Sequence, residues 1–292
     1  MNVVGLARHA PAQRGVALLV VLWGCTLAAI TLGALATNAR IESLQARTQS
    51  LRTQAFYAAE AGIDVAVFHL SDADGDRRWQ PDWQSHAMRV GDADVSVSVS
   101  AEEGKLNLNL ATPEQITDLL RAAGVDEERI GPAAKAISAW GDPGEAKDTA
   151  LLLRGGFTSL EELRRVPGLA SDIVDRIEPA LTLWTVQQPN LAYASPVVVA
   201  AVTGADAAAA RAYVDRVSRT PMGVLLLPPL PGTKPGDASR SPVAAFNIVA
   251  TATLKDGQAV TLDVVLFLKN EPGDPAAYRV VRWRERSSAG RG

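Results

Sequence analysis

The chain has 292 residues, of which 47% are hydrophobic and 21% are charged, and its formal net charge is −3 at pH 7. This length fits one large domain or two modest ones. The near-neutral charge gives no general reason to expect a nucleic-acid ligand, because such ligands are bound by strongly basic surfaces. Cys25 is the only cysteine, so an intramolecular disulfide is excluded.

An uncharged stretch near the N-terminus, residues 16–39, dominates the hydropathy pattern. A helix rises ~1.5 Å per residue and needs about 20 apolar residues to cross a hydrocarbon core of ~30 Å. The stretch therefore predicts a transmembrane helix. A cleaved secretory signal is the competing interpretation, but its apolar part usually spans only ~7–15 residues. Because the helical pattern also continues beyond the stretch, we expect the helix to be retained.

The segment before this helix, residues 1–15, is short and polar, carries Arg8 and Arg14, and ends with Gly15. It resembles the leader peptide of type IV pilins and pseudopilins. The resemblance implies that a prepilin peptidase cleaves between Gly15 and Val16 and methylates the new N-terminal amine of Val16. It also implies a single-pass inner-membrane protein with a cytoplasmic N-terminus and a periplasmic head. A plain membrane anchor that happens to follow a glycine remains the alternative.

The fifth residue after the expected cleavage point is Val20. Most pilins and pseudopilins carry glutamate here, whose carboxylate can pair with the N-terminal amine of a neighbouring subunit inside the apolar filament core. Absence of this glutamate is typical of the K-type minor pseudopilin of type II secretion, general secretion pathway protein K. This resemblance implies four kinds of partner: the I- and J-type minor pseudopilins, the major pseudopilin, the prepilin peptidase and the inner-membrane assembly platform.

Beyond the apolar stretch, residues 40–70 carry apolar side chains at helical spacings of three and four. This amphipathic pattern predicts a continuation of the same helix, laid on a head domain. A long helix that is half in the membrane and half on a head is the arrangement of pilins. We expect four residues of the amphipathic half to contact neighbouring subunits: Ile41, Leu44, Leu51 and Phe56.

Three aspartates follow the long helix with the spacing that opens a calcium-binding loop: Asp72, Asp74 and Asp76. Calcium prefers several carboxylate oxygens that converge on one point. The bidentate glutamate expected later in an EF-hand loop is missing. A calcium site and a solvated acidic turn both remain open, and the missing glutamate favours the turn. Calcium is the one cofactor that the sequence leaves open.

Two separated parts of the chain, residues 71–111 and 243–286, are expected to form one αβ head. Residues 94–100 alternate valine with serine or aspartate, which predicts a half-buried strand. Asp256 and Gly257, between two apolar runs, predict a β-hairpin because this turn requires positive φ.

A short motif strengthens the resemblance to K-type pseudopilins. Residues 103–109 read Glu-Gly-Lys-Leu-Asn-Leu-Asn, which is similar to the signature of an acidic residue, glycine, a basic residue and Asn-x-Asn at the same point in that family. The alternation of residues 106–110 also predicts a strand.

Between the two parts of the head, residues 112–227 show a helical period, and residues 228–242 form a Pro/Gly-rich linker. We therefore expect an inserted α-helical domain. Residues 157–169 resemble a helix-hairpin-helix, which raises the alternative of a membrane-anchored DNA receptor. Residues 156–180 carry five acidic residues against three arginines, whereas phosphate binding requires a positive surface. We therefore expect no nucleic-acid partner.

Catalytic patterns are missing from the sequence, since the three histidines are scattered and no glycine-rich phosphate loop occurs. We therefore do not expect an enzyme. The predicted fold is α+β, with a pilin-like long helix on a small antiparallel sheet and a large inserted helical domain. The resemblance implies a minor pseudopilin that caps the tip of the periplasmic pseudopilus, helps to initiate its assembly and supports export of folded proteins across the outer membrane. The alternatives are a type IV pilus minor pilin and the DNA receptor.

Overall fold

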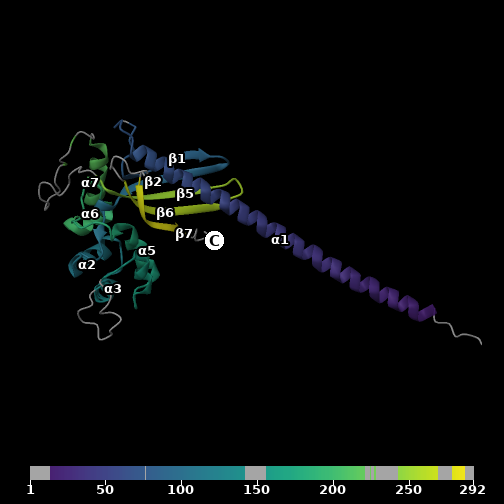
Figure 1. The fold of residues 1–292 in the computed structure, drawn as a ribbon. Helices are drawn as coiled ribbons and strands as arrows, with labels where there is room; N and C mark the ends of the chain where they lie inside the picture. The colour runs from purple at the N-terminus through teal and green to yellow at the C-terminus, as the bar shows by residue number, and fades with distance from the viewer. Residues whose placement is uncertain are drawn as a thin grey trace, which may run out of the picture. The chain divides into compact units, whose positions relative to one another are not determined.

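A computed structural model of the chain describes residues 14–75, 77–141, 156–220, 224, 227, 243–268 and 278–286. The chain divides into two compact units, Met1–Gln54 and Ala55–Gly292. The long N-terminal helix, α1 (Arg14–Leu70), contributes to both units (Figure 1).

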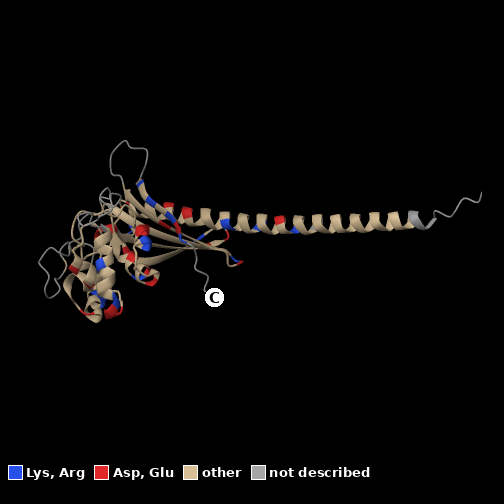
Figure 2. Ribbon diagram, turned by 90° about the horizontal axis from the view of Figure 1, so that it is seen from below, with Lys and Arg blue, Asp and Glu red and all other residues tan. Residues whose placement is uncertain are grey.

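In the first unit, the part of α1 before Arg40 is apolar, and the helix is long enough to span a membrane. In Figure 2 this part of the ribbon has no residue coloured as acidic or basic. Four threonine hydroxyls donate to carbonyls about one turn earlier: Thr26 to Trp23, Thr31 to Leu27, Thr37 to Gly33 and Thr48 to Leu44. Because lipid offers no hydrogen-bond partners, the pairing of Thr26, Thr31 and Thr37 within the uncharged stretch suits an apolar environment.

The second unit contains a five-stranded antiparallel sheet in the order β1-β2-β5-β6-β7. Its strands are β1 (Asp82–Val90), β2 (Ala93–Ala101), β5 (Ala245–Thr253), β6 (Ala259–Leu268) and β7 (Tyr278–Arg286). β2 and β5 are neighbours although they lie far apart in the sequence. The predicted hairpin is confirmed between β5 and β6, where Gly257 has a φ of 88°.

Two strands differ from the expectation. β1 was not predicted, because its residues do not alternate regularly between polar and apolar. The stretch 106–110 forms only the two-residue β3 (Leu106–Asn107), which pairs in parallel with β4 (Leu181–Thr182). The chain turns after β3 because Asn107 Oδ1 accepts the backbone N–H of Asn109 at 2.8 Å, and such side-chain bonds compete with strand pairing.

The half of α1 in the second unit packs on one face of the sheet through mostly small side chains. Its buried apolar residues are Ala55, Ala58, Ala59, Ile63, Ala66, Val67 and Leu70. The closest approach is at Gly62, where an added Cβ would lie 2.9 Å from a methyl group of Val95 and 3.0 Å from one of Val97. The small residues bring the helix close enough to remove the β-branched side chains of the sheet from water.

We therefore expect Gly62→Ala to lower the free energy of unfolding by about 1–3 kcal/mol, because the valine methyl groups must move. The matched control is Gly131→Ala, since an added Cβ at Gly131 meets no atom within 4 Å. The control should change the free energy of unfolding by less than about 1 kcal/mol, because the usual advantage of alanine over glycine inside a helix is opposed by Pro132, which disfavours helical backbone at a preceding residue with a Cβ. Urea unfolding of the full chain in detergent would measure both. Equal effects of the two changes would contradict the close packing at Gly62.

Between β3 and β5 the chain forms a set of short helices, called here the helical region. It comprises α2 (Pro113–Ala122), α3 (Glu127–Gly141), η3 (Leu160–Arg165), α5 (Ser171–Ile177), η4 (Glu178–Ala180), α6 (Pro196–Thr203) and α7 (Ala207–Arg219). Three glycines with positive φ separate successive helices: Gly124 (72°), Gly168 (81°) and Gly204 (70°). Left-handed glycines end helices, so the hairpin expected at 157–169 is one of three similar turns.

Local capping and a continuous apolar cluster stabilise the helical region. Thr112 and Gln115 form a capping box at α2, and Asp206 accepts the N–H of Ala209 at the start of α7. The largest fully buried side chains of the cluster include Leu119, Leu120, Ile130, Ile137, Leu163, Ile177, Leu181 and Tyr213. The α6–α7 pair, bent by 120°, is apolar enough to resemble a broken membrane span, but both helices contribute buried residues to this cluster.

Candidate functional site

The predicted cleavage site lies at the start of α1. Gly15 and Val16 belong to the first turn of this helix, and their side chains lie outside the described part of the structure. Cleavage between them and methylation of Val16 therefore stay predictions. Val20, which replaces the usual glutamate, is 66% exposed within the first unit, and the first turn of α1 carries no acidic residue.

The four predicted contact residues of α1 differ in accessibility. Ile41 and Leu44 are exposed, whereas Leu51 and Phe56 are half-buried. The Phe56 ring makes an edge-to-face contact with Tyr57, with ring centroids 5.7 Å apart. All four side chains therefore retain exposed surface, and their role as subunit contacts stays a prediction.

A second group of residues on α1, called here the α1 stripe, consists of the exposed Tyr57, Asp64 and Phe68 and the half-buried Ala61. Spacings of four, seven and eleven residues place them on one side of the helix. Tyr57 and Phe68 are 63% and 69% exposed. The sequence analysis missed both rings, although large aromatic residues outside the buried Ala-rich pattern were a usable signal. Such exposed rings, on a helix whose other side is buried, are typical of a protein interface.

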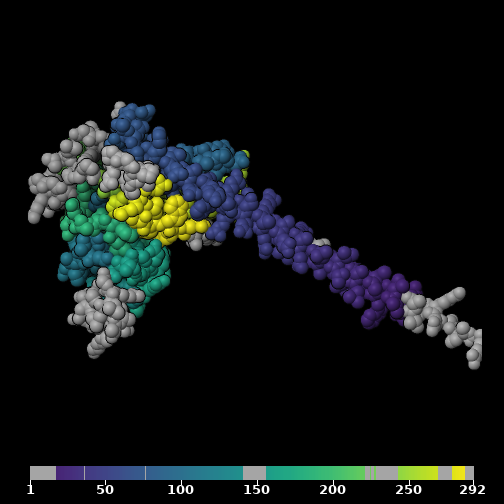
Figure 3. All heavy atoms as spheres, in the orientation of Figure 1, coloured from purple at the N-terminus to yellow at the C-terminus, as the bar shows by residue number. Residues whose placement is uncertain are grey.

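Asp64 of the α1 stripe also contacts the sheet. It accepts a hydrogen bond from the Tyr278 hydroxyl at 3.2 Å. Figure 3 shows β7 beside this half of α1. Burial, and then the nearby Asp64 carboxylate, raise the pKa of the Tyr278 phenol. The stripe therefore lies on a helix that is tied to the edge of the sheet.

The structure describes two of the three aspartates in the acidic turn after α1. Asp72 Oδ1 accepts the N–H of Asp74 at 2.9 Å, and both carboxylates face the guanidinium of Arg77, at 3.5 and 3.1 Å. Asp76 lies outside the described residues. Among the described residues no group of three acidic, histidine or cysteine side chains could hold a metal ion. Arg77 thus occupies the position that a cation would need, and calcium binding stays a prediction that depends on Asp76.

The first half of the 103–109 motif joins the sheet to the helical region. Gly104 is buried, and an added Cβ would lie 2.2 Å from the carbonyl oxygen of Tyr193. Lys105 is also buried and donates to Glu102 at 2.5 Å and to Asn247 at 3.3 Å. Glu102 in turn accepts a hydrogen bond from Thr182. A buried lysine is tolerated because it is paired and hydrogen-bonded.

The second half of the motif also forms hydrogen bonds to backbone groups of residues between β3 and β5. Asn107 donates to the carbonyl of Thr185. Asn109 donates to the Phe157 carbonyl at 2.8 Å, and its Oδ1 accepts the Phe157 N–H at 2.7 Å. The polar residues of the motif therefore act in this structure as partners of the backbone at the junction, which is a structural role.

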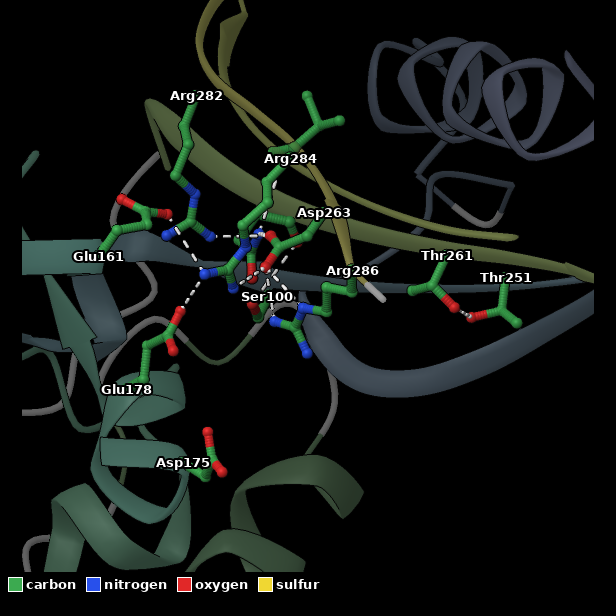
Figure 4. Close-up of polar contacts among 12 residues, drawn as sticks. Ser100, Glu161, Asp175, Glu178, Thr251, Thr261, Asp263, Arg282, Arg284 and Arg286 are labelled. Carbon is green, nitrogen blue, oxygen red and sulfur yellow. Dashed lines mark hydrogen bonds and ion pairs between the residues drawn. The ribbon is translucent and has the colours of Figure 1, made fainter. Parts of the chain in front are cut away.

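The strongest electrostatic feature of the second unit is a cluster around Asp263. This carboxylate is fully buried on β6 and contacts three arginines of β7: Arg282 at 2.8 Å, Arg284 at 3.0 Å and Arg286 at 2.5 Å. Figure 4 shows the guanidinium groups converging on it. Asn247 of β5 also donates to Asp263, at 2.6 Å. Alternation along β7 places the three arginines on one face of the strand.

Arg284 connects this cluster to the helical region. It contacts Glu178 at 2.5 Å and Glu161 at 3.2 Å (Figure 4). Three arginines therefore face three carboxylates, and the cluster carries no net charge. This balance leaves no excess positive charge to attract an anionic ligand, so the cluster joins the sheet to the helical region. An aspartate within an apolar strand and arginines at alternate positions were the sequence signals for it.

The charge of Asp263 depends on its arginine partners. Burial alone would raise the pKa of this carboxyl, but Arg282 and Arg286 outweigh burial and hold the pKa well below its usual range. The group is therefore charged in the folded protein throughout the ordinary pH range.

We expect Asp263→Asn to lower the free energy of unfolding by about 3–5 kcal/mol at neutral pH, because the arginines lose a buried partner. Since the folded pKa lies below the unfolded value of about 3.9, the stabilisation by Asp263 is complete above that value and is lost as pH falls through the acidic range. The difference between parent and variant should therefore shrink between pH 7 and pH 2. Urea unfolding across this range tests the prediction, and a constant difference would contradict it.

Two of the histidines have a packing role. The rings of His69 and His86 stack on Trp79, with centroid distances of 4.8 and 3.8 Å and interplanar angles of 5° and 9°. The stack joins the end of α1 to β1. His69 and His86 lie on opposite sides of the indole, so they do not form a shared catalytic or metal-binding pair.

Comparison with known proteins identifies the fold. No protein-family model and no curated protein matches the chain. The chain is similar to a chain in the crystal structure of the GspK-GspI-GspJ complex from the enterotoxigenic Escherichia coli type 2 secretion system. The TM-score is 0.57 with 16% sequence identity, and the match covers 84% of this chain and 100% of that chain. At this identity the similarity establishes the fold and no individual family member: the chain has a pseudopilin-like fold.

Proposed function

We propose that the chain is a K-type minor pseudopilin that caps the tip of the periplasmic pseudopilus of a type II secretion system. In this role it helps to initiate pseudopilus assembly and so supports export of folded proteins across the outer membrane. The observation that carries the proposal is the similarity to a chain of the GspK-GspI-GspJ complex, which covers 84% of this chain and 100% of that chain. The I- and J-type minor pseudopilins are the partners that this role requires.

Two features support a position at the tip. Val20 lacks the carboxylate that would neutralise the N-terminal amine of another subunit, and the terminal subunit has no earlier amine to neutralise. The helical region adds several helices to a head that must otherwise pack side by side in a narrow filament. A bulky head fits where no further subunit has to stack above it.

The DNA-receptor alternative has little electrostatic support. In the hairpin around Gly168, Arg164 contacts Asp175 at 2.6 Å, and Arg176 donates to the carbonyl of Gly124. Arg129 of α3 contacts Asp172 at 2.8 Å. These arginines are engaged within the protein, whereas phosphate binding needs cations that are free to replace counterions.

Processing of the leader is the first test. In cells with an active prepilin peptidase, mass spectrometry should show a mature chain that begins at Val16 with a methylated amine. The matched control is Gly15→Leu, which should remain uncut because the glycine before the cleavage point is replaced. A mature N-terminus within or after the apolar stretch would contradict the pseudopilin proposal.

The second test concerns the contact surface of α1. Full-length protein, co-expressed with the I- and J-type minor pseudopilins of the same bacterium and extracted in detergent, should co-purify with both. Leu51→Asp, Tyr57→Asp and Phe68→Asp should each reduce recovery of the partners roughly tenfold, because a charge at an apolar contact must be desolvated.

The matched control is Val186→Asp, which places the same charge at an apolar residue that is 86% exposed in the helical region. This variant should recover both partners as the parent does. Parent protein that binds neither partner, or that is found regularly along the filament shaft by electron microscopy, would overturn the cap proposal even if cleavage after Gly15 were confirmed.

A further inference from the structure

Among the described strands, β1 and β7 form the two edges of the sheet in the second unit, and they differ in chemistry. β7 carries four arginines and one glutamate in nine residues. Its pairing with β6 also contains a register irregularity next to Val265. Charged side chains and bulges are the devices by which proteins prevent an edge strand from pairing with another chain. The β7 edge is therefore protected.

The β1 edge lacks the charges of β7, and its own register irregularity lies between Asp82 and Ser85, at the start of the strand. β1 also spans nine residues, but its formal charges, Asp82 and Arg89, lie near its two ends. The six residues between them, Trp83 to Met88, carry none. Most of β1 is exposed, whereas β2 is largely buried. In the part of the chain that the structure describes, no strand pairs with β1 on the side away from β2 (Figure 1).

The register of β1 and β2 shows which backbone groups this edge offers. A two-residue turn joins Val90 to Ala93, and their pairing closes the hairpin. Because the closing pair of such a hairpin exchanges hydrogen bonds, alternate residues of β1 direct their N–H and C=O groups outward. These residues are Ser85, Ala87 and Arg89. Each is exposed, so the edge presents a regular row of donors and acceptors for an added strand.

A cavity of about 90 Å³ lies where β1 begins, lined by residues that include Trp83, Tyr193, Val214 and Val217. Since one water needs only roughly 10–15 Å³ by this measure, a side chain can enter it. Trp83 is the one non-glycine residue with positive φ among the described residues, at 67°. The centroid of its ring lies 5.9 Å from Lys105 Nζ, and Trp83 lines the cavity. Strand addition characteristically combines main-chain pairing with such side-chain pockets.

We propose that β1 is a docking edge, to which an extended segment of a partner pseudopilin adds as a sixth strand with a large apolar side chain in the Trp83 cavity. The source of the segment follows from continuity. Phe68 of the α1 stripe contacts His69, which stacks through Trp79 on His86 of β1. This row of contacting rings leads from the α1 stripe to β1, so a partner bound to the stripe also reaches the β1 edge. This inference rests on the proposed function, in which one copy occupies each tip, so a second copy is not the occupant.

The test removes the backbone N–H at one outward position of β1. Ala87→Pro deletes an N–H that the β1–β2 ladder does not use, and edge strands tolerate proline at such positions. Ala87→Thr is the matched control, because it changes the side chain and keeps the N–H. With the full-length I- and J-type minor pseudopilins as probes, Ala87→Pro should reduce recovery of one of them roughly tenfold, and the control should stay within about twofold of the parent.

A photo-cross-linking residue at position 87 provides a readout that does not depend on folding of the proline variant. It should cross-link to one of the two probes, whereas the same residue at position 285 on β7 should not. Parent protein that recovers its partners, with Ala87→Pro equally effective and no cross-link from position 87, would overturn this inference and leave the proposed function intact. Cross-linking only to a second copy of this chain would also overturn it. Parent protein that recovers no partner would overturn both.

Discussion

Close packing of α1 on the sheet is the contact on which the head depends. It is possible because the buried side of α1 carries alanines and Gly62, which lies against Val95 and Val97. A helix with larger residues there would lie farther from the sheet and leave its β-branched side chains partly hydrated. The same choice of residues makes the opposite side of the helix available for Tyr57 and Phe68. One amphipathic segment thus stabilises the head and leaves an aromatic surface exposed.

The second connection within the head is electrostatic. The helical region has its own apolar cluster, and its attachment to the sheet uses Asp263, Arg284 and Glu178 together with the Glu102–Lys105 pair. Buried ion pairs contribute little net stability, since desolvation offsets much of their attraction, but they are costly to break. They therefore suit a junction whose geometry must be unique. In the proposed role, in which the head contacts other subunits, such a junction would hold its two parts in one arrangement.

Local patterns in the sequence were enough to predict α1 and the β5–β6 hairpin, because a charge-free stretch, helical spacing and an Asp-Gly turn each act over a few residues. β1 could not be predicted in this way, since its conformation is imposed by pairing with β2. The Asp263 cluster was also missed, because its carboxylates and arginines come from strands and helices far apart in the sequence. The acidic turn shows the opposite limit: the spacing of Asp72 and Asp74 suited calcium, but the structure places Arg77 between their carboxylates and leaves Asp76 undescribed.

The surfaces of the sheet are used unequally, and this asymmetry constrains how the head can assemble. α1 covers one face, and the helical region is tied to the other face through Asp263 and Asn247. β7 carries four arginines, and three of them are held by the Asp263 cluster, so covering that edge with another strand would desolvate several cations. Covering the α1 stripe and β1 has no comparable cost. A partner would remove aromatic surface from water and would supply hydrogen-bond partners for the outward amide groups of β1. In the proposed docking, a partner that approached from this side would meet both surfaces at once, which would give the head a single preferred orientation.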